Sequence, residues 1–418
     1  MLDRTIAPAF HKNSSLDILD ANVTELPNGI RTFAIAGGQQ EVIKIEVIFR
    51  GGRWFERKTG SSHFAASLIN KGTSSKSSFD IARIFDLYGA HLEVNPGLDV
   101  VSVALYSLTK NLSPVLDLLI ELVNDASYPE KELVQSKSIF LQNLEVNNEK
   151  TSFQAAKLFR KSLFGQAHPY GKELDETVSD LTTADLKDHF NTCFHDLFVL
   201  ISGKISSANL NVINDSFAGV GLTTAAAPAH EFSPAKPSRV YVEKEGSVQS
   251  SLRVGKRFIG RSHPDYFDVL LLNHILGGYF GSRLMKNIRE EKGFTYGIYS
   301  SVHTLSFDNY LTIGADVNRE NLDQTFEEIQ LEMRRLRDER ISNEELNTAR
   351  NHFIGSLQSE ITTPFSHADK WKNLLLFNLP RDYYTMLVSR IESLTDKDLM
   401  AAADKYYGEG SFYEIAVG

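Results

Sequence analysis

The sequence lacks several features that mark particular classes of protein. It contains a single cysteine, Cys193, among 418 residues, which excludes an internal disulfide framework and any cysteine-rich zinc site. No apolar run approaches the roughly 20 residues that a helix needs to span a bilayer. We therefore expect Cys193 to be a buried or partly buried thiol, and we expect no membrane partner.

Basic blocks and targeting signals are also missing. The formal net charge is −9, and in the absence of a clustered basic patch nucleic acid is not an expected partner. Residues 1–17 lack the apolar core of a secretory signal peptide. If residue 1 is the natural start, these absences favour a cytoplasmic location, where thiols stay reduced.

The composition that remains is that of a globular protein. Hydrophobic residues make up 42% of the chain and charged residues 23%. A chain of this length is expected to form two or more domains with sizeable cores.

Two separate pairs of segments repeat at one offset. Residues 129–145 and 342–358 share a Glu-Leu pair, a Phe and a Leu at positions 213 residues apart. Residues 181–194 and 394–407 share a Leu and an Asp-Leu pair at the same offset of 213. Because one offset is hard to obtain twice by chance, we infer two structural repeats of roughly 200 residues.

A segment without periodicity separates the repeats. Residues 217–238 are rich in Gly, Ala, Pro, Ser and Thr, which is typical of a linker between domains. The sequence therefore predicts an N-terminal repeat over 17–216 and a C-terminal repeat over 239–418.

Strand and helix patterns mix within the first repeat. Residues 42–50 alternate apolar and polar side chains, as a half-buried strand does, and residues 100–107 form a second strand candidate. Between them, Ser78 can cap a helix that stops near Gly89. Half-polar strands among helices predict an α+β fold, in which each repeat is a mixed or antiparallel sheet with helices packed on one face.

Short words in both repeats carry a resemblance to a known enzyme family. The first repeat contains GGRWFE (51–56), His63 in a predicted helix and HPYG (168–171), and the second contains SRLMKNIREEKGFTY (282–296). Together they resemble the pitrilysin/insulinase family of zinc peptidases, in the branch of the mitochondrial processing peptidase and its two-subunit bacterial relatives. The resemblance covers about residues 30–418.

The resemblance implies both a fold and a division of labour. It implies two α+β repeats that face each other across a peptidase chamber. In active members the first repeat holds zinc through H-x-x-E-H and a later Glu, and the second supplies an Arg/Tyr pair that binds and polarises the peptide. In the two-subunit branch, one subunit keeps the zinc word while the other loses it and keeps the pair.

The zinc word is degenerate in this sequence. His63 matches the first ligand, whereas Ala66 and Ser67 stand in place of the catalytic Glu and the second His. The third ligand position falls at about Asn143, and Glu145 lies about 200° further round a helix, so it cannot simply substitute. Because a catalytic zinc needs three protein ligands, we expect no metal in this chain and no peptidase activity from it alone. The alternative for His63 is an ordinary partly buried histidine.

Arg289 and Tyr296 are the candidate catalytic pair, acting on a partner's substrate. They lie seven residues apart within the most specific segment of the resemblance. An arginine offers a planar fork for a carbonyl or carboxylate, and a tyrosine hydroxyl can donate to a developing oxyanion. Composition alone favours a simpler interpretation, a solvated arginine and a core tyrosine.

A glycine-containing loop precedes this pair. It lacks the pattern of a phosphate-binding loop, and the resemblance places it near the substrate path. Gly277, Gly278, Gly281 and Ser282 are therefore candidate substrate-binding residues. The alternative is a turn that ends the preceding helix.

These features together predict the non-catalytic subunit of a heterodimeric zinc peptidase. The expected partner is a homologous subunit that carries the zinc, and the expected substrate is a peptide or unfolded protein bound by strand addition at a sheet edge. The main alternative is a non-enzymatic scaffold or peptide-binding homodimer of the same fold. A weaker alternative is an active peptidase with a displaced metal site.

Overall fold

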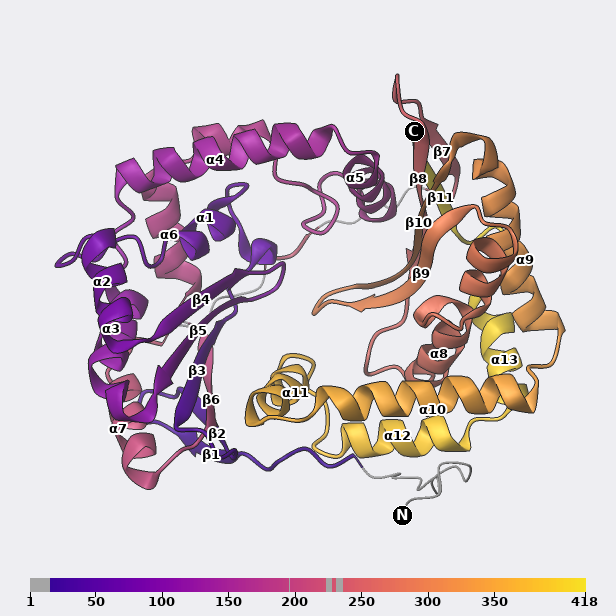
Figure 1. Ribbon diagram of the computed structural model, residues 1–418. Helices are drawn as coiled ribbons and strands as arrows, with labels where there is room; N and C mark the ends of the chain where they lie inside the picture. The colour runs from indigo at the N-terminus through magenta and orange to yellow at the C-terminus, as the bar shows by residue number, and fades with distance from the viewer. Residues whose placement is uncertain (1–15, 195, 223–227, 231–235) are drawn as a thin grey trace, which may run out of the picture.

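The protein folds into two α/β units, each built around its own sheet (Figure 1). The structure is a computed structural model that describes residues 16–194, 196–222, 228–230 and 236–418. The first sheet has six strands in the order β1-β2-β6-β3-β5-β4, and the second has five in the order β7-β11-β8-β10-β9. Both are mixed, because β2 runs parallel to β6 and β7 parallel to β11, while the other neighbours are antiparallel.

The elements alternate along the chain as a mixed α+β fold requires. Those of the first unit are β1 (Asn22–Glu25), β2 (Arg31–Ala36), β3 (Val42–Phe49), η1 (Arg53–Phe55), α1 (Ser61–Ser67), α2 (Ser78–Tyr88), β4 (His91–Pro96), β5 (Val101–Leu108), η2 (Thr109–Asn111), α3 (Leu112–Asp125), α4 (Glu130–Asn148), α5 (Thr151–Phe164), η3 (Glu176–Asp180), α6 (Thr183–Cys193), β6 (Leu197–Gly203) and α7 (Ser207–Ala218). Those of the second unit are β7 (Arg239–Val242), β8 (Gln249–Arg257), α8 (Tyr266–Asn273), the π-helical turns η4 (His274–Gly278) and η5 (Met285–Glu291), β9 (Thr295–Thr304), β10 (Asn309–Asn318), η6 (Arg319–Asn321), α9 (Leu322–Asp338), α10 (Asn343–Glu360), α11 (Pro364–Leu376), α12 (Tyr383–Ser393), α13 (Asp396–Tyr406) and β11 (Tyr413–Val417).

The two units repeat one topology. The strand order β2-β6-β3-β5-β4 of the first sheet corresponds to β7-β11-β8-β10-β9 of the second. Helices α4, α5 and α6 begin at residues 130, 151 and 183, and α10, α11 and α13 begin at 343, 364 and 396, so the offset is 213 for each pair. The α+β class and the two homologous repeats are confirmed. The proposed linker includes residues 223–227 and 231–235, which lie outside the described residues, and its bounds stay a prediction.

Capping residues account for the limits of α2. The helix begins one residue earlier than predicted, because Ser77 rather than Ser78 is the N-cap and forms a reciprocal capping box with Asp80. It ends at Tyr88 and is capped by Gly89, whose φ of 61° is left-handed and favours glycine.

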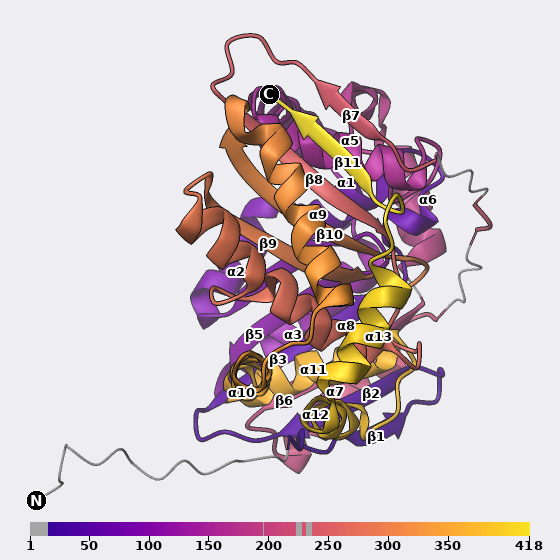
Figure 2. The same cartoon turned by 90° about the vertical axis from the view of Figure 1, so that its right-hand side faces the viewer.

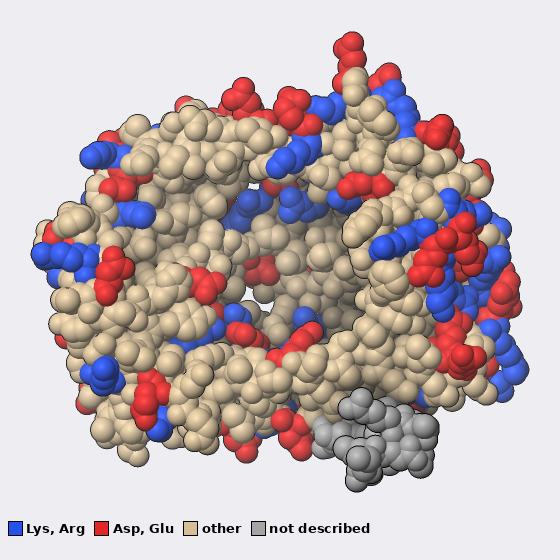
Figure 3. All heavy atoms as spheres, viewed as in Figure 1, with Lys and Arg blue, Asp and Glu red and all other residues tan. Residues whose placement is uncertain are grey.

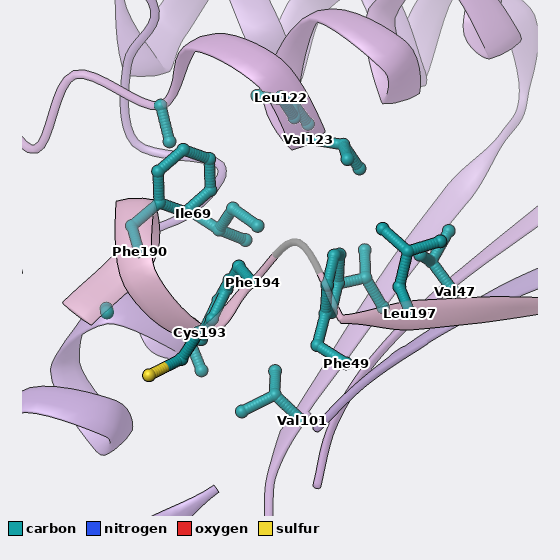
Figure 4. Packing of buried hydrophobic residues seen from close by; sticks show 14 of the residues in the cluster. Val47, Phe49, Ile69, Val101, Leu122, Val123, Phe190, Cys193, Phe194 and Leu197 are labelled. Carbon is teal, nitrogen blue, oxygen red and sulfur yellow. The ribbon is translucent and has the colours of Figure 1, made fainter. Parts of the chain in front are cut away.

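One face of each sheet carries the hydrophobic core. In the first unit the core lies between the sheet and α3, and Figure 4 shows a part of it in which the rings of Phe49 and Phe194 stack 5.0 Å apart. Cys193 lies in the same cluster with 6% of its surface exposed, so the prediction of a buried thiol is confirmed. In the second unit α8, α9 and α13 cover the corresponding face (Figure 2).

The opposite face of each sheet is partly covered by a helix from the other unit. Helix α5 packs on β8 and β11 of the second sheet, and α11 packs on β6 and β2 of the first. The prediction that one face of strand 42–50 is open to solvent is therefore wrong: Lys44 and Glu46 are only 6% and 2% exposed. They pair with each other at 2.8 Å, and Lys372 of α11 reaches Glu46 at 2.8 Å.

The two sheets face each other across an opening. Helices α4 and α5 lie on one side of it and α10 and α11 on the other (Figure 1). The space-filling view is hollowed at the same place, with basic side chains along its upper edge (Figure 3). None of the described helices is long and apolar enough to cross a bilayer.

Candidate functional site

Helix α1 holds the positions of the zinc word close to the first core. The carboxylate of Glu56 accepts hydrogen bonds from the backbone N–H groups of Gly60 at 3.0 Å and Ser62 at 3.1 Å. These bonds satisfy amide groups of the first turn that have no partner within the helix. Burial raises the pKa of Glu56. A seven-residue helix is thereby fixed in place with His63 in its first half.

The ring of His63 packs among aromatic side chains. Its centroid is 5.2 Å from that of Phe64 and 5.8 Å from that of Phe140 on α4. Burial, and then the positive charge of Arg53, lower the pKa of His63 to about 4. The ring is therefore neutral at pH 7, as expected of a partly buried histidine.

The other positions of the zinc word add no metal donor to His63. Ala66 is fully buried in the core, Ser67 is half-buried and Asn143 is exposed on α4. In the part of the chain that the structure describes, no group of three or more His, Cys, Asp or Glu side chains could hold a metal ion. Because a catalytic zinc needs three protein ligands, these residues do not fit one.

The second unit brings Arg289 and Tyr296 together. Arg289 lies near the end of η5, and Tyr296 is the second residue of β9. The guanidinium carbon of Arg289 is 4.8 Å from the ring centroid of Tyr296 and 4.7 Å from that of Phe280. The guanidinium group thus contacts two aromatic rings, an arrangement that favours a cation.

Tyr296 is open to solvent at the edge of the second sheet. Its side chain is 89% exposed, so the alternative of a core tyrosine is wrong. Strand β9 pairs with β10 and ends the strand order of its sheet. The far side of β9 can therefore offer backbone N–H and C=O groups to an added strand.

Close packing favours glycine at three positions before this pair, most strongly at Gly277, where the nearest atoms include backbone. A Cβ on Gly277 would lie 2.8 Å from the backbone nitrogen of Ser300, and one on Gly278 would lie 2.8 Å from Nδ1 of His274. A Cβ on Gly281 would lie 2.8 Å from the ring of Tyr279. The side chain of the fourth candidate, Ser282, is buried. The four candidates shape the turn, and their side-chain positions face protein.

Phe280 is the residue of this loop that the sequence reasoning missed. It is 55% exposed and contacts Arg289. The sequence feature that could have identified Phe280 is its place in a glycine-rich segment, where an aromatic side chain stands next to residues without side chains. Tyr299, at 50% exposure, is a second exposed aromatic residue on β9.

Two histidines, His274 and His352, pack against Tyr279 of the glycine-containing loop. The ring of Tyr279 stacks on His274 at 4.6 Å and lies 4.7 Å from His352 of α10. Nε2 of His274 is 3.1 Å from Nδ1 of His352. Burial, followed by the charge of His352, lowers the pKa of His274 to about 4. At neutral pH the ring of His274 is therefore uncharged, and together with the ring of His352 it packs against the loop that carries Phe280.

Comparison with known families accounts for most of the chain. Residues 33–177 match the insulinase family, peptidase family M16, and residues 180–353 match the domain described as the peptidase M16 inactive domain. This chain belongs to the insulinase, or M16, peptidase family. The resemblance predicted from the sequence words is confirmed at that level.

Curated M16 relatives are similar over much of their length. An uncharacterized zinc protease of Bacillus subtilis is 26% identical over 326 residues, which are 76% of this chain and 78% of that protein. Another, of Rickettsia felis, is 22% identical over 406 residues, 92% of this chain and 95% of that protein. The bovine mitochondrial-processing peptidase subunit beta is 22% identical over 275 residues, 63% of this chain and 55% of that subunit.

Solved structures confirm the M16 fold. A peptidase M16 inactive domain from Pseudomonas fluorescens superposes with a TM-score of 0.88 at 23% identity, over 96% of this chain and 98% of that one. A protease from Helicobacter pylori gives 0.86 at 16% identity, over 96% and 99%.

Two of the M16 words found in the sequence have a packing role here. Trp54 of GGRWFE stacks on Phe307, which lies in the β9–β10 turn, with centroids 4.2 Å apart. Tyr170 of HPYG donates a hydrogen bond to Asp99, which also accepts one from the backbone N–H of Ser306 at 2.7 Å. The two motifs of the first unit therefore contact the turn of the β9–β10 hairpin of the second unit.

Proposed function

We propose that this M16 chain is the non-catalytic, substrate-binding subunit of a heterodimeric zinc metallopeptidase. The observation that carries the proposal is the contact between Arg289 and Tyr296, with the tyrosine exposed on the free edge of β9. Support also comes from the zinc word, whose residues in this chain do not fit a metal. The zinc and the steps that occur on it would then belong to a homologous partner subunit.

The pair can act on a peptide that extends along β9. Backbone groups on the free edge of the strand would hold the peptide in an extended conformation by strand addition. The Tyr296 hydroxyl would donate a hydrogen bond to the carbonyl oxygen where negative charge develops. Arg289, oriented by Phe280 and Tyr296, would hold its guanidinium toward the same carbonyl or a nearby carboxylate. No proton leaves this chain in such a scheme.

Reconstitution with a zinc-bearing M16 relative tests the proposal. We expect no cleavage of a quenched fluorescent peptide by this chain alone and cleavage by the mixture. Arg289→Ala and Tyr296→Phe should each lower kcat/KM of the mixture by about 10- to 1,000-fold, since each removes a group that stabilises developing charge. Full activity with both variants would show that the assigned roles are wrong.

Matched controls separate this role from general damage. Arg319→Ala removes an exposed arginine that pairs with Glu243 at 3.3 Å, and Tyr241→Phe removes from β7 a hydroxyl that donates to the carbonyl oxygen of Gly418. Both should leave kcat/KM within about twofold. Size-exclusion chromatography with light scattering completes the test, because a stable homodimer that refuses the zinc-bearing partner would favour the scaffold function instead.

A further inference from the structure

A small cavity beside η1 gathers basic side chains away from Arg289 and Tyr296. Its volume is about 110 Å³, and its lining includes Arg53, Arg57 and Lys172 together with a single carboxylate, that of Glu56. His230 closes one side, where its Nε2 lies 2.9 Å from the carbonyl oxygen of Trp54. The cavity is thus assembled from the word GGRWFE, the segment that follows HPYG, and the inter-unit connection.

Most N–H donors of the Arg53 guanidinium group have no hydrogen-bond acceptor among the described residues. Its Nη1 donates one hydrogen bond, to the carbonyl oxygen of Lys172 at 2.9 Å, whereas a guanidinium group carries five N–H donors. Among the described residues no carboxylate forms an ion pair with it. Burial lowers the pKa of Arg53, and the charge of Glu56 opposes this only in part. A half-buried cation whose attractive carboxylate, that of Glu56, already accepts backbone hydrogen bonds is unfavourable, since its desolvation is only partly repaid.

The carboxylate of Glu56, which lines the cavity, already accepts hydrogen bonds from the backbone of α1 and its N-cap. Oε2 of Glu56 accepts from the N–H of Gly60, and Oε1 accepts from the N–H of Ser62. Both oxygens therefore serve the first turn of α1.

The remaining two cations leave the cavity positively charged. Arg57 is 74% exposed along its side chain and donates a hydrogen bond to Asp188 at 3.4 Å, an ion pair that offsets part of its charge from outside the cavity lining. Lys172 is exposed. Three positive groups and one engaged carboxylate thus converge on a space about the size of one oxyanion.

We propose that this cavity is a binding site for a single oxyanion group, a carboxylate or a phosphate. The planar fork of Arg53 would bind two of its oxygens, because guanidinium groups pair with carboxylates and phosphates in a bidentate manner. Lys172 and Arg57 would approach from the open side and complete the charge balance. The site is independent of the proposed peptidase role, since none of its residues contacts Arg289 or Tyr296.

Titration calorimetry on the full chain tests the site, with sodium phosphate and sodium acetate as probes and sodium chloride at equal ionic strength as the reference. We expect saturable binding of at least one probe and a rise in Tm with its concentration. Tighter phosphate binding would identify a phosphate group as the natural ligand, and tighter acetate binding a carboxylate. If neither probe binds saturably up to about 20 mM beyond the chloride reference, the proposal is overturned.

Variants distinguish anion binding in the cavity from non-specific binding to positive charge elsewhere on the surface. Arg53→Lys keeps the charge but loses the fork, and should weaken binding by at least about fivefold. Lys172→Gln neutralises an exposed side chain and should weaken binding by about three- to tenfold. The control Lys244→Gln, a lysine that pairs with Glu149 at 2.9 Å, should change Kd by less than twofold. Binding unchanged in both Arg53→Lys and Lys172→Gln would overturn the site even if the anion binds.

Discussion

Each unit of this chain covers part of the other unit's sheet with a helix, yet the two contacts differ in chemistry. Phe159 of α5 lies on the second sheet so closely that a Cβ on Gly255 would come within 2.7 Å of its ring. At the equivalent position of α11, 213 residues later, Lys372 pairs with the buried Glu46 of the first sheet at 2.8 Å. At this equivalent position one side chain is apolar and the other charged, although α11 also packs apolar side chains such as Trp371 against Phe33 of the first sheet. The repeat therefore preserves where the contact lies, and the side chains decide how strongly and at which pH it holds.

The same divergence marks the candidate sites. The first unit keeps His63 but has no further donors at Ala66 and Ser67, whereas the second unit holds Arg289 against Tyr296. Four variants, from the largest expected effect on stability to the smallest, test how far the two units differ.

Phe159→Ala should give the largest loss, because it removes a large buried ring from the contact between α5 and the second sheet. Phe159 is 2% exposed and packs near Tyr310 with centroids 6.2 Å apart. Removing such a ring should lower the free energy of unfolding by about 3–5 kcal/mol, measured by urea denaturation. Phe79→Ala is the control, since Phe79 is 73% exposed and should cost less than about 0.5 kcal/mol. A loss below about 1 kcal/mol for Phe159→Ala would mean that α5 contributes little to the second sheet.

Lys372→Met should cost less, about 1–3 kcal/mol, because Lys44 still pairs with Glu46. Burial raises the pKa of Glu46, but Lys372 and Lys44 outweigh it, so this pKa lies below its ordinary value. A carboxyl with a lowered folded-state pKa stabilises the protein above its unfolded pKa, near 4.3, and that stability is lost as pH falls through the folded pKa. Unfolding measured from pH 7 to pH 3 should therefore show a flatter acid decline in the variant.

Lys370→Met is the matched control on the same helix. Lys370 pairs at 2.8 Å with Glu360, whose side chain is 61% exposed, so the pair is screened by water. Equal losses for Lys370→Met and Lys372→Met would contradict a special role for the buried pair.

Acid should also loosen the glycine loop of the second unit. The pKa of His274 lies at about 4 in the folded protein against about 6.5 when unfolded. Stability from the neutral ring is thus complete above about pH 6.5 and is lost as pH falls toward 4, at most about 2 kcal/mol between pH 8 and pH 5. His274→Leu should remove this part of the pH dependence in thermal unfolding, whereas His91→Leu, at an exposed position, should not. An unchanged acid slope in His274→Leu would count against the pair of rings.

The sequence was sufficient to predict the two α+β repeats and the family, because both rest on patterns within a repeat. The offset of 213 recurs in three pairs of helices, and alternation located β3. The burial of Lys44 and Glu46 could not be predicted in this way, because Lys372, which covers them, lies more than 300 residues away. Phe280 was missed for a related reason. Its contact with Arg289 depends on the conformation of the turn that contains the three closely packed glycines.

Restoring ligands to the first unit should change stability least and metal binding most. Ser67 is half-buried and Asn143 exposed, so Ser67→His with Asn143→Glu should cost less than about 1 kcal/mol. Phe140, one helical turn before Asn143, lies with its ring centroid 5.8 Å from that of His63, so this part of α4 is next to α1. We expect the double variant to bind about one zinc in competition with a chromophoric chelator and the unmodified chain to bind none. Peptide cleavage should still be absent, because Ala66 provides no carboxylate to accept a proton from water. Cleavage by the double variant would show that a base outside the zinc word serves this unit, and failure to bind zinc would show that the two helices have moved apart from a ligating geometry.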